Sequence, residues 1–193
     1  MSNEKSIRAF LAVDPPREVL NEIIMIQERL KKSIQGDVRW VRPEGIHLTL
    51  KFFGNISDTE RENISAVVKN NVVIVKPFTV NVRKVGAFPD VNRPRVLWLG
   101  VDGDVDPLIS LQKAIDRGLQ GCGFKKEDRP FRPHLTLARV KDPRGLIGLA
   151  KILEKSEEYV AGHFDVGGLI LFKSDLTPKG AIYTKLDVFP FTG

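Results

Sequence analysis

Hydrophobic and polar residues alternate along several stretches of this chain, and apolar residues recur every three or four positions along others. Alternation is typical of a β-strand with one buried face, because successive side chains point to opposite sides. A spacing of three to four residues is typical of an amphipathic helix. We therefore expect strands over residues 7–13, 38–41, 46–54, 77–88, 95–101, 133–139, 162–173 and 180–189, with four helices between them.

Short polar signals mark where the helices are expected to begin. Asp14 followed by Pro15 is typical of an N-cap and the first helical residue. Ser57 and Glu60 have the spacing of a capping box, in which side chain and backbone bond each other reciprocally. The other two helices are expected to start at the Asp-Pro pairs of residues 106–107 and 142–143.

The order strand, helix, strand, strand, helix, strand occurs roughly twice, which predicts an α+β fold with two similar lobes. We expect two antiparallel sheets, each flanked by helices, that face each other across a central cleft. The terminal strands are expected to cross into the opposite lobe. Residues 1–193 are therefore interpreted as a single domain of two interleaved lobes.

One phrase, His-Leu-Thr-Leu, occurs twice, once in each half of the chain. The copies start at His47 and His134, and each lies in an apolar run bounded by glycine or proline. On a strand, the histidine and Thr49 of the first copy share one face, while the leucines take the other. The same holds for His134 and Thr136. Each lobe is therefore expected to present one imidazole and one hydroxyl to the cleft.

These residue types suit acid and base catalysis on an anion. A histidine titrates near pH 6.5 and can give or take a proton, and a threonine hydroxyl can hold an anionic oxygen. A lone histidine on a half-buried strand is more often structural. Two of the three histidines in identical contexts favour an active site at His47 and His134.

Composition narrows the class of protein without fixing a function. The net charge of +6 is compatible with an anionic partner but is also common on solvated surfaces. The single cysteine, Cys122, excludes a disulfide within the chain, and no histidine spacing indicates a zinc site. The sequence lacks an N-terminal signal-peptide pattern and an apolar run of about 20 residues. We expect a cytoplasmic monomer that binds no membrane, metal or other cofactor.

The two phrases resemble the paired H-x-T-x signatures of the two-histidine (2H) phosphoesterases. Within that superfamily, the chain is most similar to the RNA 2′,3′-cyclic phosphodiesterases, also called 2′-5′ RNA ligases. The resemblance covers nearly the whole chain. It includes residues 7–14, 40–44, 93–101, 131–133 and 172–176, together with Gly180 and Tyr183.

The resemblance implies the same bilobed fold and a metal-independent reaction. RNA ends carrying a 2′,3′-cyclic phosphate, for example on tRNA fragments, would be hydrolysed to 2′-phosphates. His47 would be the proton donor and His134 the proton acceptor, with Thr49 and Thr136 holding the phosphate. Reverse use of the site, with an RNA 5′-hydroxyl, would form a 2′-5′ linkage. The residues alone leave open which histidine is the acid, because the two phrases are nearly symmetric.

Three basic residues near the phrases are further candidates for substrate binding. Lys51 shares strand parity with His47 and Thr49, and Arg132 shares it with His134. Arg139 has the parity of the buried leucines, so it reaches the cleft only if the strand ends or bulges before it.

Two alternatives remain open from the sequence. One is a related 2H phosphoesterase that acts on a small cyclic nucleotide or a 2′-5′ oligonucleotide, a choice that the loops at 89–94 and 125–130 would influence. The other is an RNA-end binding module without turnover. The presence of both histidines and both threonines favours an enzyme, because binding alone does not require two titrating groups. The physiological RNA and the cellular role of ligation are not readable from the sequence.

Overall fold

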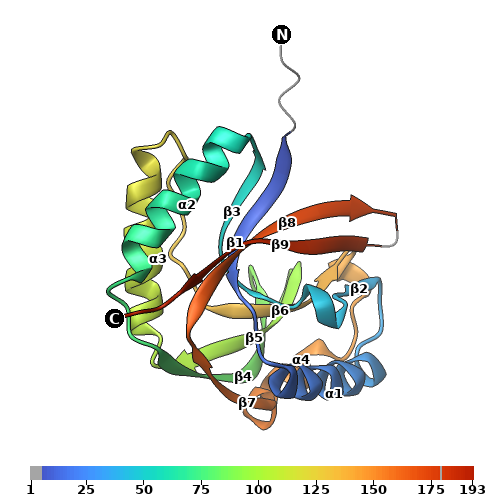
Figure 1. Ribbon diagram of the computed structural model, residues 1–193. Coiled ribbons are helices and arrows are strands. Elements are labelled where there is room, and N and C mark those ends of the chain that lie inside the picture. The colour runs from blue at the N-terminus through green and yellow to red at the C-terminus, as the bar shows by residue number, and fades with distance from the viewer. Residues whose placement is uncertain (1–5, 179) are drawn as a thin grey trace.

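The computed structural model describes residues 6–178 and 180–193, which form a strongly curved antiparallel sheet with four α-helices packed against it (Figure 1). The helices are α1 (Arg17–Ser33), α2 (Asp58–Val72), α3 (Asp106–Gln120) and α4 (Leu149–Glu154). The strands are β1 (Ile7–Val13), β2 (Val38–Trp40), β3 (Leu48–Ile56), β4 (Phe78–Phe88), β5 (Val96–Gly103), β6 (His134–Val140), β7 (Val160–Val166), β8 (Gly168–Thr177) and β9 (Gly180–Pro190).

The strand order is β7-β4-β5-β6-β3-β1-β8-β9, and β2 pairs with β6 at the side of this path. We call β3, β1, β8 and β9 the β3 half, and β6, β5, β4, β7 and β2 the β6 half. The halves join through one pair, Leu48 opposite Leu135. The α+β class is confirmed, and the two expected sheets are the halves of one continuous sheet.

The strand order also shows where the chain crosses between the halves. β7 pairs with β4 in the β6 half. β8, which is separated from β7 by a single residue, pairs with β1 in the β3 half. The terminal strands β1 and β9 both lie in the β3 half. Each half therefore contains strands from both the early and the late parts of the sequence.

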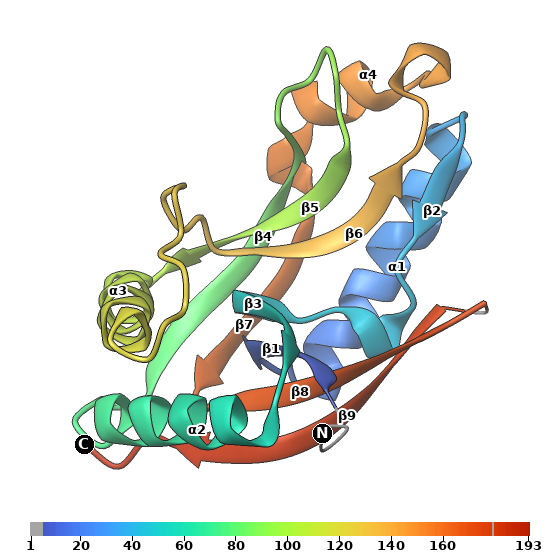
Figure 2. The same ribbon diagram turned by 90° about the horizontal axis from the view of Figure 1, so that it is seen from above.

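The helices cover the sheet in two pairs (Figure 2). α1 packs against β7 and α4, and α2 packs against α3 and β9. Their apolar faces join one buried core with the leucines of both His-Leu-Thr-Leu phrases, and Leu48, Leu135 and Leu137 have no solvent exposure. Full burial of such a side chain contributes roughly 1.5–3 kcal/mol to the stability of the fold. The leucines therefore hold both phrases against the core.

The expected start of the first helix was wrong. α1 begins at Arg17 after Pro16, whose position as N-cap provides no side-chain hydrogen bond. A residue that precedes proline is disfavoured in the helical region, and Pro15 precedes Pro16. The helix therefore starts only after the second proline, and Asp14 is left free for another role.

The expected helix from residues 142–143 is also interrupted. The chain forms a short 3-10 turn at Pro143–Gly145 and then α4, which starts after Gly148. Gly148 has φ +92°, and a Cβ atom there would overlap the Ser33 carbonyl oxygen. Close contact with the end of α1 thus breaks the helix.

The apolar stretch at residues 162–173 forms parts of two strands, where one was expected. β7 ends at Val166 and β8 begins at Gly168, with the crossing between halves at Gly167. The buried positions change parity at this break, from Phe164 and Val166 on β7 to Leu169 and Leu171 on β8. The expected hairpin of β8 and β9 is confirmed.

No helix in the described ranges is both long and apolar enough to cross a membrane.

The capping box at the start of α2 is confirmed and can be tested. The Ser57 hydroxyl accepts from the Glu60 backbone N–H at 3.2 Å, and the Glu60 carboxylate accepts from the Ser57 backbone N–H at 2.7 Å. We expect Ser57→Ala to lower the free energy of unfolding in urea by about 1 kcal/mol, since a backbone donor loses its partner. Ser33→Ala, at an exposed hydroxyl, should change it by less than about 0.5 kcal/mol. Equal losses in the two variants would contradict the role of the cap.

Candidate active site

The two phrases meet at a cleft of about 280 Å³ on the face of the sheet between the halves. Both histidines and both threonines line it. The remaining lining residues are Leu50, Lys51, Phe52, Phe88, Val96, Glu127 and Arg139.

The Leu48–Leu135 pair fixes how the phrases face each other. Because β3 and β6 are antiparallel, continuing this register by one residue in each direction sets His47 opposite Thr136. It likewise sets Thr49 opposite His134. Each histidine is thus placed beside the threonine of the other phrase, and an approximate two-fold axis passes between the leucines.

A β-bulge follows each threonine at the same position of the phrase. On β3, Leu11 pairs with Lys51 and Ala12 with Thr49, so Leu50 has no opposite partner. On β6, Leu97 pairs with Ala138 and Trp98 with Thr136, so Leu137 has none. A bulge reverses the alternation of the residues that follow it.

Two predicted binding residues follow the bulges. Lys51 lines the cleft with Thr49, but its ammonium is directed to Asp116 of α3. Phe52, which follows the bulge, also lines the cleft. Arg139 was expected to reach the cleft only if the strand ended or bulged before it. The bulge at Leu137 meets this condition, and Arg139 lines the cleft. Phe52, with 59% of its surface exposed, was not among the predicted residues.

His47 is buried in an aromatic box. The rings of Phe10, Phe172 and Tyr183 lie 5.6, 4.6 and 5.3 Å from its own, centroid to centroid. Burial lowers the pKa of His47 below its ordinary value, because the charged ring is poorly solvated there.

A carboxylate lies beside this ring. The Nε2 atom of His47 is 3.7 Å from Asp14 Oδ1, and Lys185 Nζ is 2.7 Å from the other oxygen of Asp14. Asp14 and the backbone of Gly45 partly oppose the fall in the pKa of His47, whereas Lys185 adds to it. The sequence offered Asp14 as a helix cap, so its position beside His47 was missed.

His134 has different neighbours. Phe88 and Trp98 lie edge-on to its ring, with centroids 5.0 and 6.4 Å away. Burial lowers the pKa of His134, a hydrogen bond with the Arg132 carbonyl opposes this, and the positive charge of Arg139 lowers the pKa further. The net direction is downward, so the uncharged ring is favoured.

The hydrogen bond of His134 indicates its tautomer. Nδ1 lies 2.7 Å from the Arg132 carbonyl oxygen, which can only accept. Nδ1 therefore carries the proton, and in the uncharged ring Nε2 is the atom that can accept one. The side chain of Arg132 is exposed and lies outside the residues that line the cleft. Its backbone, instead, orients the histidine.

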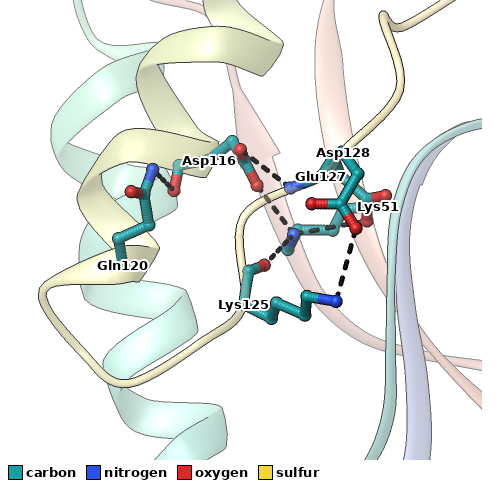
Figure 3. Close-up of polar contacts among 6 residues, drawn as sticks. All are labelled: Lys51, Asp116, Gln120, Lys125, Glu127 and Asp128. Atoms are coloured by element: carbon teal, nitrogen blue, oxygen red, sulfur yellow. Dashed lines mark hydrogen bonds and ion pairs between the residues drawn. The ribbon is translucent and has the colours of Figure 1, made fainter.

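Lys51, one of the residues that line the cleft, is held in a polar cluster with residues of α3 and of the loop that follows it (Figure 3). Its ammonium donates to Asp116 of α3 at 2.7 Å, to the Lys125 carbonyl at 3.0 Å and to Glu127 at 3.3 Å. Asp116 also accepts from the Glu127 backbone N–H. This cluster ties β3 to the loop of residues 121–133 that leads into His134. No group of three or more histidine, cysteine or acidic side chains that could hold a metal occurs in the described part of the chain.

The cluster should contribute strongly to stability. In Lys51→Met, Asp116 would remain buried without its cation, so we expect a loss of about 3 kcal/mol in the free energy of unfolding. Lys125→Met removes an ammonium from the neighbouring exposed pair with Asp128 and should cost less than about 1 kcal/mol. Urea unfolding of both variants measures the difference. Similar small losses would show that the cluster does not hold the loop.

Comparison with known proteins places the chain in a family. The model of the 2′-5′ RNA ligase superfamily matches residues 15–178. An RNA 2′,3′-cyclic phosphodiesterase of Methanothermobacter thermautotrophicus is 38% identical over 183 residues, covering 95% of this chain and 98% of the relative.

Solved structures share the fold. A protein of Thermus thermophilus superposes with a TM-score of 0.77 at 29% identity, covering 97% of this chain and 99% of that one. E. coli LigT complexed with 3′-AMP has a TM-score of 0.77 at 26% identity, covering 98% and 100%. The two His-Leu-Thr-Leu phrases, the fold around them and these matches all indicate the same family. The chain belongs to the 2′-5′ RNA ligase superfamily.

Proposed function

We propose that this protein hydrolyses the 2′,3′-cyclic phosphate ends of RNA to 2′-phosphates by a metal-independent two-histidine mechanism. The observation that carries the proposal is the cleft in which two His–Thr pairs, one from each half, lie across the Leu48–Leu135 register. The activity named for the Methanothermobacter relative and the 3′-AMP bound to LigT support the same substrate class.

His134 is suited to be the base. Its Nδ1 proton is held by the Arg132 carbonyl, which leaves Nε2 as a proton acceptor. Burial and the neighbouring Arg139 favour the uncharged form. A ring that is uncharged near neutral pH can take a proton from water.

His47 is suited to be the acid. The carboxylate of Asp14 near its Nε2 stabilises the protonated ring against the effect of burial. An anionic phosphate in the cleft would act in the same direction. The two rings have equivalent places in the fold, so the charges of Asp14 and Arg139 supply the asymmetry that the sequence motif lacks.

The reaction can be followed atom by atom. His134 takes a proton from water as its oxygen attacks phosphorus, and the bond from phosphorus to O3′ breaks. His47 gives its proton to O3′, which leaves as a hydroxyl, and the phosphate stays on O2′. Exchange with solvent then restores both histidines. General acid and base catalysis contribute about 10²–10⁴ each.

The remaining cleft residues are assigned to the phosphate. Thr49, Thr136 and Arg139 hold its non-bridging oxygens and stabilise the charge that develops as water attacks. Lys51 and Arg132 act indirectly, since the Lys51 ammonium already has three oxygen partners and Arg132 contributes its carbonyl. An RNA 5′-hydroxyl in the place of water would yield a 2′-5′ linkage by the same steps.

The direct test is turnover of a short RNA ending in a 2′,3′-cyclic phosphate, in the presence of EDTA, with 2′- and 3′-phosphate products separated. We expect the 2′-phosphate, and a loss of at least about 100-fold in kcat for both His47→Ala and His134→Ala. His163→Ala, at an exposed histidine of β7, is the matched control. Tight binding without turnover would indicate an RNA-end binding module, and activity that survives both changes would place the site elsewhere.

The roles of the two histidines can be tested by pH profiles of kcat/KM. Asp14→Asn should lower the pKa of His47, because the carboxylate that raises it is removed, and Lys185→Met should raise it. If His47 is the acid, the alkaline limb moves to lower pH in the first variant and to higher pH in the second. Movement of the acidic limb instead would make His47 the base. Profiles that do not move would exclude an effect of Asp14 on catalysis.

A further inference from the structure

Two arginines continue the cleft beyond Arg139. β2 pairs with β6, and Arg39 lies directly opposite Arg139 in that register. Side chains of directly opposed residues lie on the same face of an antiparallel pair. Since Arg139 lines the cleft, Arg39 lies on the cleft face of the sheet, one strand further out. Both side chains are exposed.

Arg42 extends this line toward the β8–β9 hairpin. It follows β2 at the start of the 3-10 turn Pro43–Gly45. A Cβ atom built on Gly180, at the start of β9, would lie 3.9 Å from Arg39 Nη2 and 4.0 Å from Arg42 Nε. The two guanidinium groups therefore converge on Gly180, where β9 begins. We call Arg139, Arg39 and Arg42 the arginine row.

The row carries positive charge without internal compensation. In the described ranges, no carboxylate lies within ion-pair distance of any of the three guanidinium groups, although many other basic side chains are paired. Like charges directly opposite each other destabilise a sheet. The row therefore lowers stability unless an anion lies across it.

We propose that Arg39 and Arg42 of the arginine row bind the phosphates of the RNA strand that leads to the cyclic end, so that the protein acts preferentially on RNA strands over single nucleotides. The inference rests on the proposed function and names its substrate class. Arginine presents a planar fork of donors that matches phosphate oxygens. With the cyclic phosphate held between the histidines and by Arg139, the row leaves Arg39 and Arg42 for the phosphates that precede it.

The backbone of a single strand is the occupant that the geometry favours. The arginines lie on the rim of a small cleft and at an exposed hairpin, where only an extended ligand reaches both. Phosphate contacts of this type position a strand without reading its sequence. The row is therefore expected to favour longer RNA strands over single nucleotides, whatever their base sequence.

The test compares two substrates in the double variant Arg39→Gln/Arg42→Gln. One substrate is a mononucleoside 2′,3′-cyclic phosphate, and the other is an RNA of several nucleotides with the same end. We expect the ratio of kcat/KM for the RNA to that for the mononucleotide to fall about tenfold or more. The salt dependence of RNA turnover should also weaken, by about 0.7 in logarithmic slope for each lost phosphate contact.

The matched control is Lys69→Gln/Lys151→Gln, which removes two exposed charges from α2 and α4. It should leave the ratio and the salt slope unchanged. An unchanged ratio in the arginine variant, or an equal fall in the control, would overturn the proposal.

Failure of the proposed function would be visible separately, as absence of turnover of either substrate by the unaltered protein. Binding of a labelled single-stranded RNA, measured by fluorescence anisotropy, would then test the row alone. Weaker binding by the arginine variant than by the lysine variant would support it, and equal binding would exclude it.

Discussion

The whole site depends on the single strand pair between Leu48 and Leu135. Both leucines are fully buried, so a slip of one residue on either strand would expose a leucine and push a histidine into the core. The hydrophobic energy of two ordinary core residues thus fixes the relative position of the two histidines that line the cleft. The positions of the histidines are thus set by the neighbouring leucines, because the pair that joins the two halves is Leu48–Leu135.

A nearly symmetric backbone carries an asymmetric set of charges. In both phrases the ring contacts backbone two residues earlier, aromatic side chains surround it, and a bulge follows the threonine. The differences lie outside the phrases, in Asp14 beside one ring and Arg139 beside the other. The two histidines of one repeated motif therefore have different electrostatic surroundings, through neighbours that the repeat does not include.

The sequence was informative where the relevant physics is local. Alternation of leucines with histidine and threonine predicted which side chains share a face, and the Ser57–Glu60 spacing predicted the start of α2. The bulges at Leu50 and Leu137 carry no local signal, since the apolar pattern passes through them. The partner of Lys51 is a side chain on α3, 65 residues away, and no sequence spacing predicts such a contact. The pairing of Asp14 with His47 was missed for a related reason, because an aspartate before a proline has a common local explanation as a helix cap. Only the second proline, which delays the helix, indicated otherwise.

The late strands have a consequence for how the chain is made. Until β7 and β8 leave the ribosome, β4 and β1 each have an open edge, because their partners come from the last third of the sequence. The contacts that complete both halves span most of the chain, and such long-range topology slows folding. Although the motif is duplicated, neither half of the sequence encodes a separable folding unit, and the nascent protein carries two unpaired strand edges until synthesis is almost complete.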